Sequence, residues 1–302
     1  MVLARDGAVG GVDVRGAAPG TRETDLLRVE NAVDGVHGLV FSGGSAYGLA
    51  TGSGVMRYLE EQGVGHRVRE FIVPIVPGAI IFDLGIGTSA RPTDADGYAA
   101  AAAANDGPVV QGSVGAGTGA TVGKALGRGS SMKGGVGSAS MDVGDGVVLA
   151  ALAVVNAIGG VHEPDTGELL AGARDDDGKP RGSIGIYADP AYGARTRPSS
   201  TESLANTTLG IIATSVSLTK SQTNRLATVA HDGLALAIRP VHTIHDGDTV
   251  FALATGIVDA ADEFPRLCVL APTVMARAIV NAVRNAESLH GVPAMSDVNL
   301  NG

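Results

Sequence analysis

Short apolar runs, each bounded by Gly, Pro or Asp, recur along this chain and constrain its fold more than any other feature. Runs of this length with many β-branched residues are typical of buried strands. They lie at residues 38–41, 71–76, 147–156, 209–214, 249–255 and 267–271. Because the runs are apolar on both faces, we expect sheets that are covered on each side.

Helical patterns lie between these runs, at residues 47–62, 97–105, 220–238 and 272–285. Thr219 is placed to cap the third helix, and Pro272 occupies a favoured first-turn position of the fourth. Both halves of the chain supply strands and helices, which predicts a layered α+β sandwich rather than two independent domains. The strand that begins near Thr207 should lie at its centre.

Composition excludes several classes of protein. The 302 residues are 44% hydrophobic with a net charge of −9, which argues against a disordered chain and against a nucleic-acid partner. The single cysteine, Cys268, excludes an internal disulfide, and its apolar neighbours predict burial. The N-terminus lacks a signal-peptide pattern, and no uncharged apolar run reaches the ~18 residues of a membrane helix. We therefore expect a cytoplasmic protein without a membrane partner.

No metal or other cofactor is expected. His242 and His245 are three residues apart but have no second ligand pair, so a zinc site is not indicated. The glycine-rich run at residues 115–124 has the wrong spacing for a phosphate loop, and Ala125 stands where Ser or Thr is required. Close backbone packing explains its glycines better.

The tripeptide Asn206-Thr207-Thr208 follows a long polar interval and opens an apolar run. A hydroxyl residue after Asn, where a loop becomes a strand, is the position of the nucleophile in a self-cleaving hydrolase. Cleavage after Asn206 would free the α-amine of Thr207, whose pKa near ~8 suits a general base. The same tripeptide also occurs as an ordinary turn-to-strand junction. The polar interval, residues 159–205, is interpreted as an exposed, mobile linker.

Three further clusters contain candidate catalytic residues. Asp246 and Asp248 precede a strand and project to one side if the backbone there is extended, although an Asp-rich hairpin turn has the same pattern. Asn156 ends a buried strand, where an amide either satisfies local backbone groups or stabilises an oxyanion. Lys133 lies among glycines and is either a partly buried ammonium or an ordinary solvated lysine.

Five segments, taken together and in order, resemble the L-aminopeptidase/D-amidase/D-esterase family, peptidase family S58, which includes β-aminopeptidases and the nylon-oligomer hydrolase. They span nearly the whole chain: residues 10–25, 42–49, 115–124 with 133–140, 206–208 and 231–256. The resemblance implies an α+β fold, a four-layer αββα sandwich of the N-terminal-nucleophile-hydrolase-like (ornithine acetyltransferase-like) type. It also implies one hydrolase domain, residues 1–302, self-processed into an α-part (1–206) and a β-part (207–302).

The resemblance assigns roles to the residues that match its segments. Thr207 would be the nucleophile, Asn206 the residue before the autocleaved bond, and Asn156 the oxyanion donor. Lys133 would lie near the nucleophile, with Asp246 and Asp248 orienting it. Substrate binding would involve Ser45, Tyr47 and Phe82.

Two departures from the family pattern stand out. Phe82 occupies the position where some members have a catalytic tyrosine, so oxyanion stabilisation would depend more on Asn156 and backbone N–H groups. The stretch that normally precedes Gly7 is short, which could expose a sheet edge or alter assembly.

The resemblance predicts hydrolysis of small peptides, amides or esters with a free amino end through an acyl-threonine intermediate, by a homo-oligomer of processed protomers. Two alternatives use the same fold. One is an acyltransferase of the ornithine-acetyltransferase type, which transfers the acyl group to an amine. The other is an inactive, unprocessed relative that acts as a binding protein.

Overall fold

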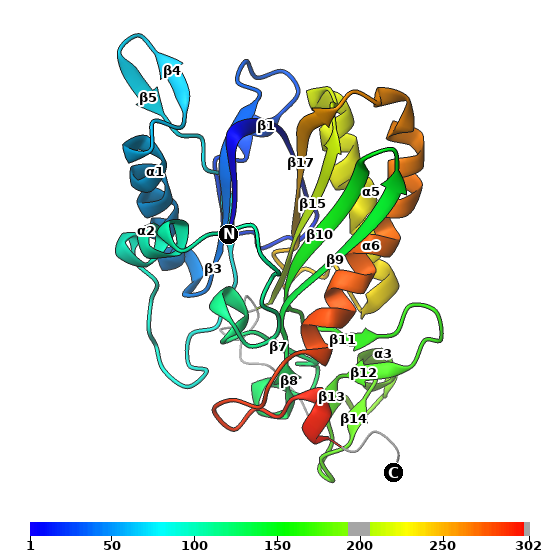
Figure 1. Cartoon of the computed structure of the whole chain (residues 1–302). Helices are drawn as coiled ribbons and strands as arrows, with labels where there is room; N and C mark the ends of the chain where they lie inside the picture. The colour runs from blue at the N-terminus through cyan, green and yellow to red at the C-terminus, as the bar shows by residue number, and fades with distance from the viewer. Residues whose placement is uncertain (193–205, 299–302) are drawn as a thin grey trace.

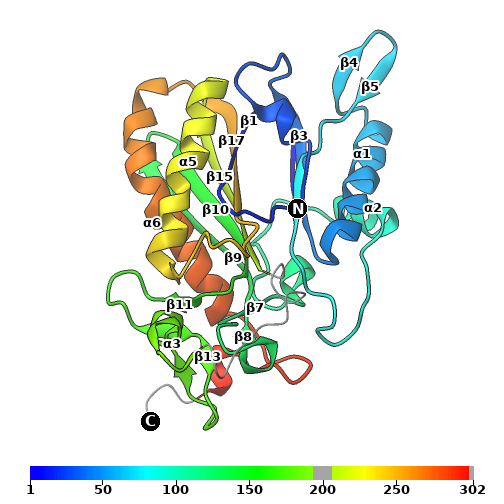
Figure 2. The same ribbon diagram turned by 180° about the vertical axis from the view of Figure 1, so that it is seen from behind.

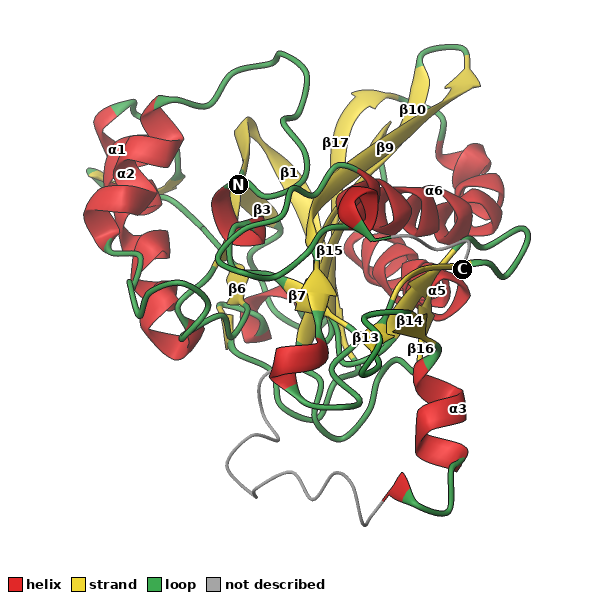
Figure 3. Ribbon diagram, turned by 90° about the horizontal axis from the view of Figure 1, so that it is seen from below, coloured by secondary structure: helices red, strands yellow, loops and turns green. Residues whose placement is uncertain are grey.

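The computed structural model describes residues 1–192 and 206–298 and has four layers (Figure 1). Helices α1 (Thr51–Glu61) and α2 (Asp94–Ala102) form one outer layer, and α5 (Lys220–Ala237) and α6 (Phe264–Arg284) form the other. Strands fill the space between them, as the view from behind and the view from below also show (Figures 2 and 3). The predicted αββα sandwich is confirmed.

The two inner layers are parts of one eight-stranded sheet with the order β2-β6-β3-β1-β17-β15-β10-β9. Its strands are β1 (Val2–Val14), β2 (Thr21–Arg22), β3 (Gly35–Ser42), β6 (Gly78–Ile80), β9 (Gly135–Gly144), β10 (Val147–Asn156), β15 (Thr207–Val216) and β17 (Thr249–Val258). An apolar cluster lies between the layers, where the rings of Phe41 and Phe251 are 5.9 Å apart. Strand β1 pairs with both β3 and β17, so it is not an edge of the sheet.

The alternation of side chains along the central strands decides which residues face the interior. On β15, Leu209 and Ile211 belong to the cluster between the β layers, whereas Ile212 packs with the cluster under α5 and α6. Thr207 has the same parity as Leu209, and on β10 Asn156 has the same parity as Val154 of the inner cluster. Because side chains alternate with period two, both polar residues point between the layers.

Helix α6 corrects two sequence-based predictions. Residues 267–271, predicted as a strand, lie within it, and Pro272 lies inside the helix rather than in its first turn. The buried positions Leu267, Ala271 and Val274 follow helical spacing, which a five-residue apolar window is too short to distinguish from a strand. Cys268 is partly rather than fully buried.

Helix α6 is also long and apolar enough to cross a membrane, counted with its preceding turn as Ala261–Arg284. More than half of its most apolar window is buried, and the buried side packs against β9 and β10. Core packing therefore accounts for its apolar character.

Two other segments differ from the sequence-based prediction. Residues 71–76 do not form a buried strand: only β5 (Phe71–Val73) forms, in a projecting hairpin with β4 (His66–Val68), and Phe71 is 62% exposed (Figure 1). The glycine-rich β9 was not predicted as a strand. Gly137 allows α6 to approach it, because a Cβ there would lie 2.0 Å from the carbonyl oxygen of Ala278.

The interval predicted as a linker contains structure up to Tyr192. It forms β11 (Gly160–His162), β12 (Leu169–Ala171), β13 (Ala173–Arg174), β14 (Pro180–Arg181) and α3 (Ser183–Ala188). Strand β11 also pairs with β16 (Ile238–Arg239), which ties this region to the end of α5. The rest of the predicted linker, residues 193–205, lies outside the described residues.

Candidate active site

Thr207 and Asn156 lie opposite each other at the ends of two central strands. Thr207 begins β15, Asn156 ends β10, and the two are direct partners in the antiparallel register. Both side chains are buried and project from the same face of the sheet. Two residues that are 51 positions apart in the sequence therefore lie side by side.

Two donors converge on the carbonyl oxygen of the Asn206–Thr207 peptide bond. Thr207 Oγ1 donates to the carbonyl oxygen of Asn206 at 2.5 Å, and the backbone N–H of Gly247 donates to the same oxygen at 2.9 Å. A Cβ on Gly247 would lie 2.8 Å from Thr207 Oγ1 and 2.6 Å from the Ala18 carbonyl oxygen. The absence of a side chain at this position lets the turn approach the hydroxyl and direct an N–H at the carbonyl.

Asp248 anchors the backbone directly after Thr207. Its Oδ1 accepts the N–H of Thr208 at 2.6 Å, and its Oδ2 accepts the backbone N–H of His242 at 3.0 Å. The Nδ1 of His242 is 2.8 Å from the same Oδ2. This buried carboxylate fixes the start of β15 against the loop before β17.

Asp246 bridges to Asn206 through the backbone and is also buried. Its Oδ2 accepts from the backbone N–H of Thr243 at 2.9 Å and from its hydroxyl at 2.6 Å. Burial, followed by the charge of Asp248, raises the pKa of Asp246 to about 6. Its Oδ1 has no hydrogen-bond partner within the part of the chain that the structure describes, so this carboxyl is suited to exchange a proton.

Two buried lysines border the site. Lys133, on β8 (Met132–Lys133), donates to the carbonyl oxygen of Thr118 at 2.6 Å, and burial lowers its pKa to about 8 against the opposing charge of Asp83. Lys133 is thus not an ordinary solvated lysine. Lys124 follows β7 (Thr121–Val122), and its Nζ lies 2.9 Å from both oxygens of Asn156.

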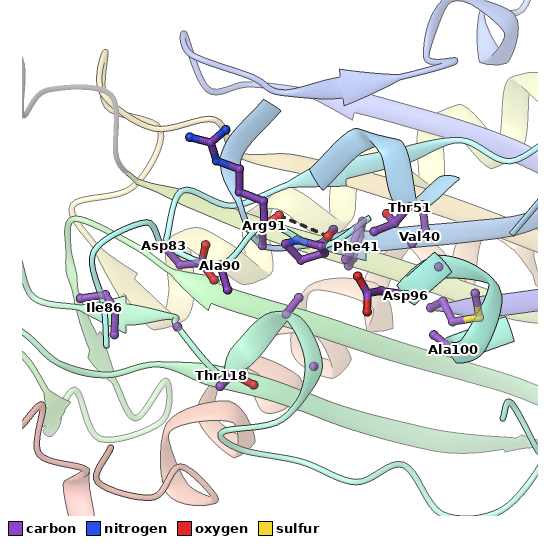
Figure 4. A pocket seen from close by; sticks show the side chains of 18 of the residues that line it. Val40, Phe41, Thr51, Asp83, Ile86, Ala90, Arg91, Asp96, Ala100 and Thr118 are labelled. Carbon is purple, nitrogen blue, oxygen red and sulfur yellow. Dashed lines mark hydrogen bonds between the residues drawn. The ribbon is translucent and has the colours of Figure 1, made fainter. Parts of the chain in front are cut away.

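A cavity of about 530 Å³ lies between β3, α2 and the glycine-rich turn at Gly115–Gly117 (Figure 4). Its lining includes Phe41, Asp83 and Thr118, together with Ser42 and Gly43 at the end of β3. Asp83 Oδ1 accepts the backbone N–H of Gly44 at 2.7 Å, so its carboxylate is fixed at the cavity wall.

The three residues predicted to bind substrate are not part of this lining. Ser45 begins a 3-10 turn with φ of 56°, and Tyr47 is 56% exposed with the Arg91 guanidinium 3.8 Å from its ring centroid. Phe82 precedes Asp83, and its carbonyl oxygen accepts Asn156 Nδ2 at 3.1 Å. The backbone at Phe82 therefore connects the cavity wall to the Asn156–Thr207 pair.

Sequence reasoning missed three residues that the structure brings to this site: Lys124, Asp83 and His242. The position of Lys124 at the end of a glycine-rich run was considered only as part of a phosphate loop. His242 was weighed only as a zinc ligand, and Asp83 was not singled out as an individual residue. Nothing in the local sequence marks any of them, because each reaches the site through tertiary packing.

Comparisons with known proteins bear on the family of this chain. The model of peptidase family S58 matches residues 2–296. An uncharacterized aminopeptidase of Mycobacterium tuberculosis is 44% identical, covering 99% of this chain and 88% of the relative. A 6-aminohexanoate-oligomer endohydrolase of Paenarthrobacter ureafaciens is 32% identical, covering 84% of this chain and 68% of the relative.

Solved structures share the fold. An L-aminopeptidase D-Ala-esterase/amidase from Ochrobactrum anthropi, described as a variant of the Ntn hydrolase fold, superimposes with a TM-score of 0.66 at 19% identity, covering 94% of this chain and 74% of that one. A Burkholderia sp. β-aminopeptidase gives a TM-score of 0.65 at 22% identity, covering 97% and 79%. None of these matches supports the acyltransferase alternative. The family match and the sequence relatives show that the chain belongs to peptidase family S58 and is a hydrolase of the aminopeptidase/amidase type.

Proposed function

We propose that this aminopeptidase/amidase is made active by cleavage of its own Asn206–Thr207 bond, and that Thr207 is then its nucleophile. One observation carries the proposal: Thr207 Oγ1 and the Gly247 N–H both lie on the carbonyl oxygen of Asn206, at 2.5 and 2.9 Å. A hydroxyl on the scissile carbonyl and an N–H donor for its developing charge are what an N-to-O acyl shift requires.

Maturation then follows in two steps, an acyl shift and an ester hydrolysis. Thr207 Oγ1 bonds to the Asn206 carbonyl carbon, the C–N bond breaks, and the hydroxyl proton ends on the departing nitrogen, which leaves an ester. Water hydrolyses that ester to give the Asn206 carboxyl group and restores the hydroxyl on a threonine with a free α-amine. Asp246, with its raised pKa, is suited to accept and return a proton during these steps.

Turnover uses the same groups on an external substrate. The Thr207 α-amine takes the hydroxyl proton, Oγ1 attacks the substrate carbonyl, and the oxyanion is stabilised by Asn156 with the Gly247 N–H. The leaving amine takes the proton, and water then hydrolyses the acyl-threonine. Asp248 maintains the position of the nucleophile through its bond to Thr208.

The cavity behind Phe82 and Asp83 is proposed to hold the acyl part of the substrate. Its wall combines apolar groups such as Phe41 and Ala116 with the carboxylate of Asp83. An apolar chain that ends in an ammonium group matches this lining, since the fixed carboxylate can accept charge-assisted hydrogen bonds. The substrate is therefore a small amide, peptide or ester with a free amino end.

We also propose that processed protomers assemble into homo-oligomers.

Intact-mass measurement of purified protein, followed by N-terminal sequencing, tests the central proposal. We expect two fragments, one beginning at Met1 and one at Thr207, and hydrolysis of aminoacyl anilides in the same sample. Active material that consists only of a 30.1 kDa chain would contradict it.

A further inference from the structure

Lys124 has a buried ammonium group to which the proposed reaction assigns no task. Its Nζ lies 2.9 Å from the backbone oxygen of Asn156 and 2.9 Å from the side-chain Oδ1 of the same residue. Burial lowers the pKa of Lys124 to about 7, while the charge of Asp246 opposes that shift. Because burial of a charged group is unfavourable, we expect this lysine to have a role other than keeping the protein soluble.

The backbone around Lys124 is built to direct its side chain to Asn156. The N–H groups of Gly123 and Lys124 donate to the carbonyl oxygens of Gly159 and Ile158, both at 2.9 Å. Gly123 has a φ of 71°, and a Cβ there would lie 2.1 Å from the carbonyl carbon of Gly172, so no other residue fits this turn. The segment after β7 is thereby fixed beside the chain that leaves β10.

The contacts of the Asn156 amide show what this lysine does. Oδ1 accepts from Lys124 Nζ at 2.9 Å and from the backbone N–H of Thr121 at 3.0 Å, while Nδ2 donates to the carbonyl oxygen of Phe82 at 3.1 Å. Neither the Thr121 N–H nor Lys124 in its protonated form can accept a hydrogen bond, and the Phe82 carbonyl cannot donate one. If the amide were flipped, its NH₂ group would face two donors, Lys124 Nζ and the Thr121 N–H. Its oxygen would face the carbonyl oxygen of Phe82, which is an acceptor.

We propose that Lys124 is a positioning residue, which holds the Asn156 amide with its NH₂ group as the donor end opposite Thr207. This inference rests on the proposed role of Asn156 as oxyanion donor. It predicts that loss of Lys124 lowers the rate of the chemical step, while substrate binding is little affected. Its effect must be transmitted through Asn156.

The test is a double-mutant cycle on processed enzyme, with Lys124→Met, Asn156→Ala and the combination, each normalised to the processed fraction found by intact mass. We expect Lys124→Met to lower kcat by about 10²-fold with KM nearly unchanged, because removal of an oxyanion donor costs about 10²–10³-fold. In the Asn156→Ala background the same substitution should cost less than about threefold, since residues acting as a unit are non-additive. Lys124→Arg, which keeps a donor, should recover part of the loss.

The outcomes separate this inference from the proposed function. If Asn156→Ala has wild-type kcat, the proposed role of Asn156 fails. If Asn156→Ala is impaired but Lys124→Met is fully active, or costs the same factor in both backgrounds, only the inference about Lys124 fails. Lys179→Met, at an exposed lysine, is the matched control and should behave as wild type.

If either single variant does not mature, Lys124→Arg and Lys124→Gln are compared with Lys124→Met instead, because both retain an N–H donor. Their maturation and turnover must exceed those of Lys124→Met for the inference to stand. Equal loss in all three, at an unchanged Tm, would overturn it.

Discussion

Asn156 and Thr207 are direct cross-strand partners at the ends of β10 and β15. This register brings the proposed oxyanion donor and nucleophile to one face of the sheet without any contribution from a flexible loop. A slip of one residue would turn one of them to the helix-covered side. The continuous antiparallel ladder from Leu149 to Asn156 therefore positions the site as well as stabilising the sheet.

Thr207→Ala should give a full-length, inactive chain. The substitution removes the hydroxyl that contacts the Asn206 carbonyl, so no acyl shift can begin. The measurement is intact mass together with turnover of an aminoacyl anilide. Thr208→Val is the matched control: it removes a neighbouring buried hydroxyl that has no hydrogen-bond partner among the described residues, and it should mature normally. Cleaved Thr207→Ala protein would place the nucleophile elsewhere.

Asn156→Ala should lower both activity and stability. The kcat is expected to fall by about 10²–10³-fold through loss of an oxyanion donor. The free energy of unfolding should fall by about 1–3 kcal/mol for each partner left unsatisfied, such as the Thr121 N–H. Steady-state kinetics and thermal unfolding measure the two effects separately. An unchanged kcat with a lowered Tm would leave Asn156 with a structural role alone.

Asp246→Asn should stabilise the unprocessed protein at neutral pH. The pKa of Asp246 is raised from 3.8 to about 6, so between these values the folded state binds more protons than the unfolded state, and stability falls as pH rises. At about 1.4 kcal/mol per pKa unit, the variant should gain up to about 3 kcal/mol above pH ~6 and nothing below pH ~4. Thermal unfolding of Thr207→Ala with and without Asp246→Asn, across that range, measures the difference. A gain that does not vary with pH would mean that the pKa of Asp246 is not raised in the folded state.

Asp83→Asn should weaken recognition of the substrate ammonium. The amide oxygen can still accept the Gly44 N–H, so the fold is retained while the charge is lost. A charge-assisted hydrogen bond contributes about 1.5–3 kcal/mol, so KM for aminoacyl amides should rise about tenfold or more. The same amides without the amino group should show no change. Asp94→Asn, which alters a surface ion pair with Arg57, is the control. An equal rise in KM for both substrate series would exclude Asp83 as the ammonium site.

Much of the fold was predictable because its signals are local. Residues 147–156 read as a strand and form β10, and Thr219 caps α5 with a capping box that includes Gln222. The failures were also local in origin. Residues 267–271 formed part of a helix because five apolar residues fit either period, and β9 was missed because its glycines serve the approach of α6.

The sequence by itself determined the layered α+β architecture, the Asn206–Thr207 junction and the candidates Asn156, Lys133, Asp246 and Asp248, since strand periodicity and residue type are properties of neighbours in the chain. Only the tertiary structure decided that Lys124 holds the amide of Asn156, that Asp83 lines the cavity, and that Tyr47 lies in solvent. The physical reason is that these contacts join segments far apart in the sequence. They depend on strand register and on the close approach of backbones at glycine, which no local pattern encodes.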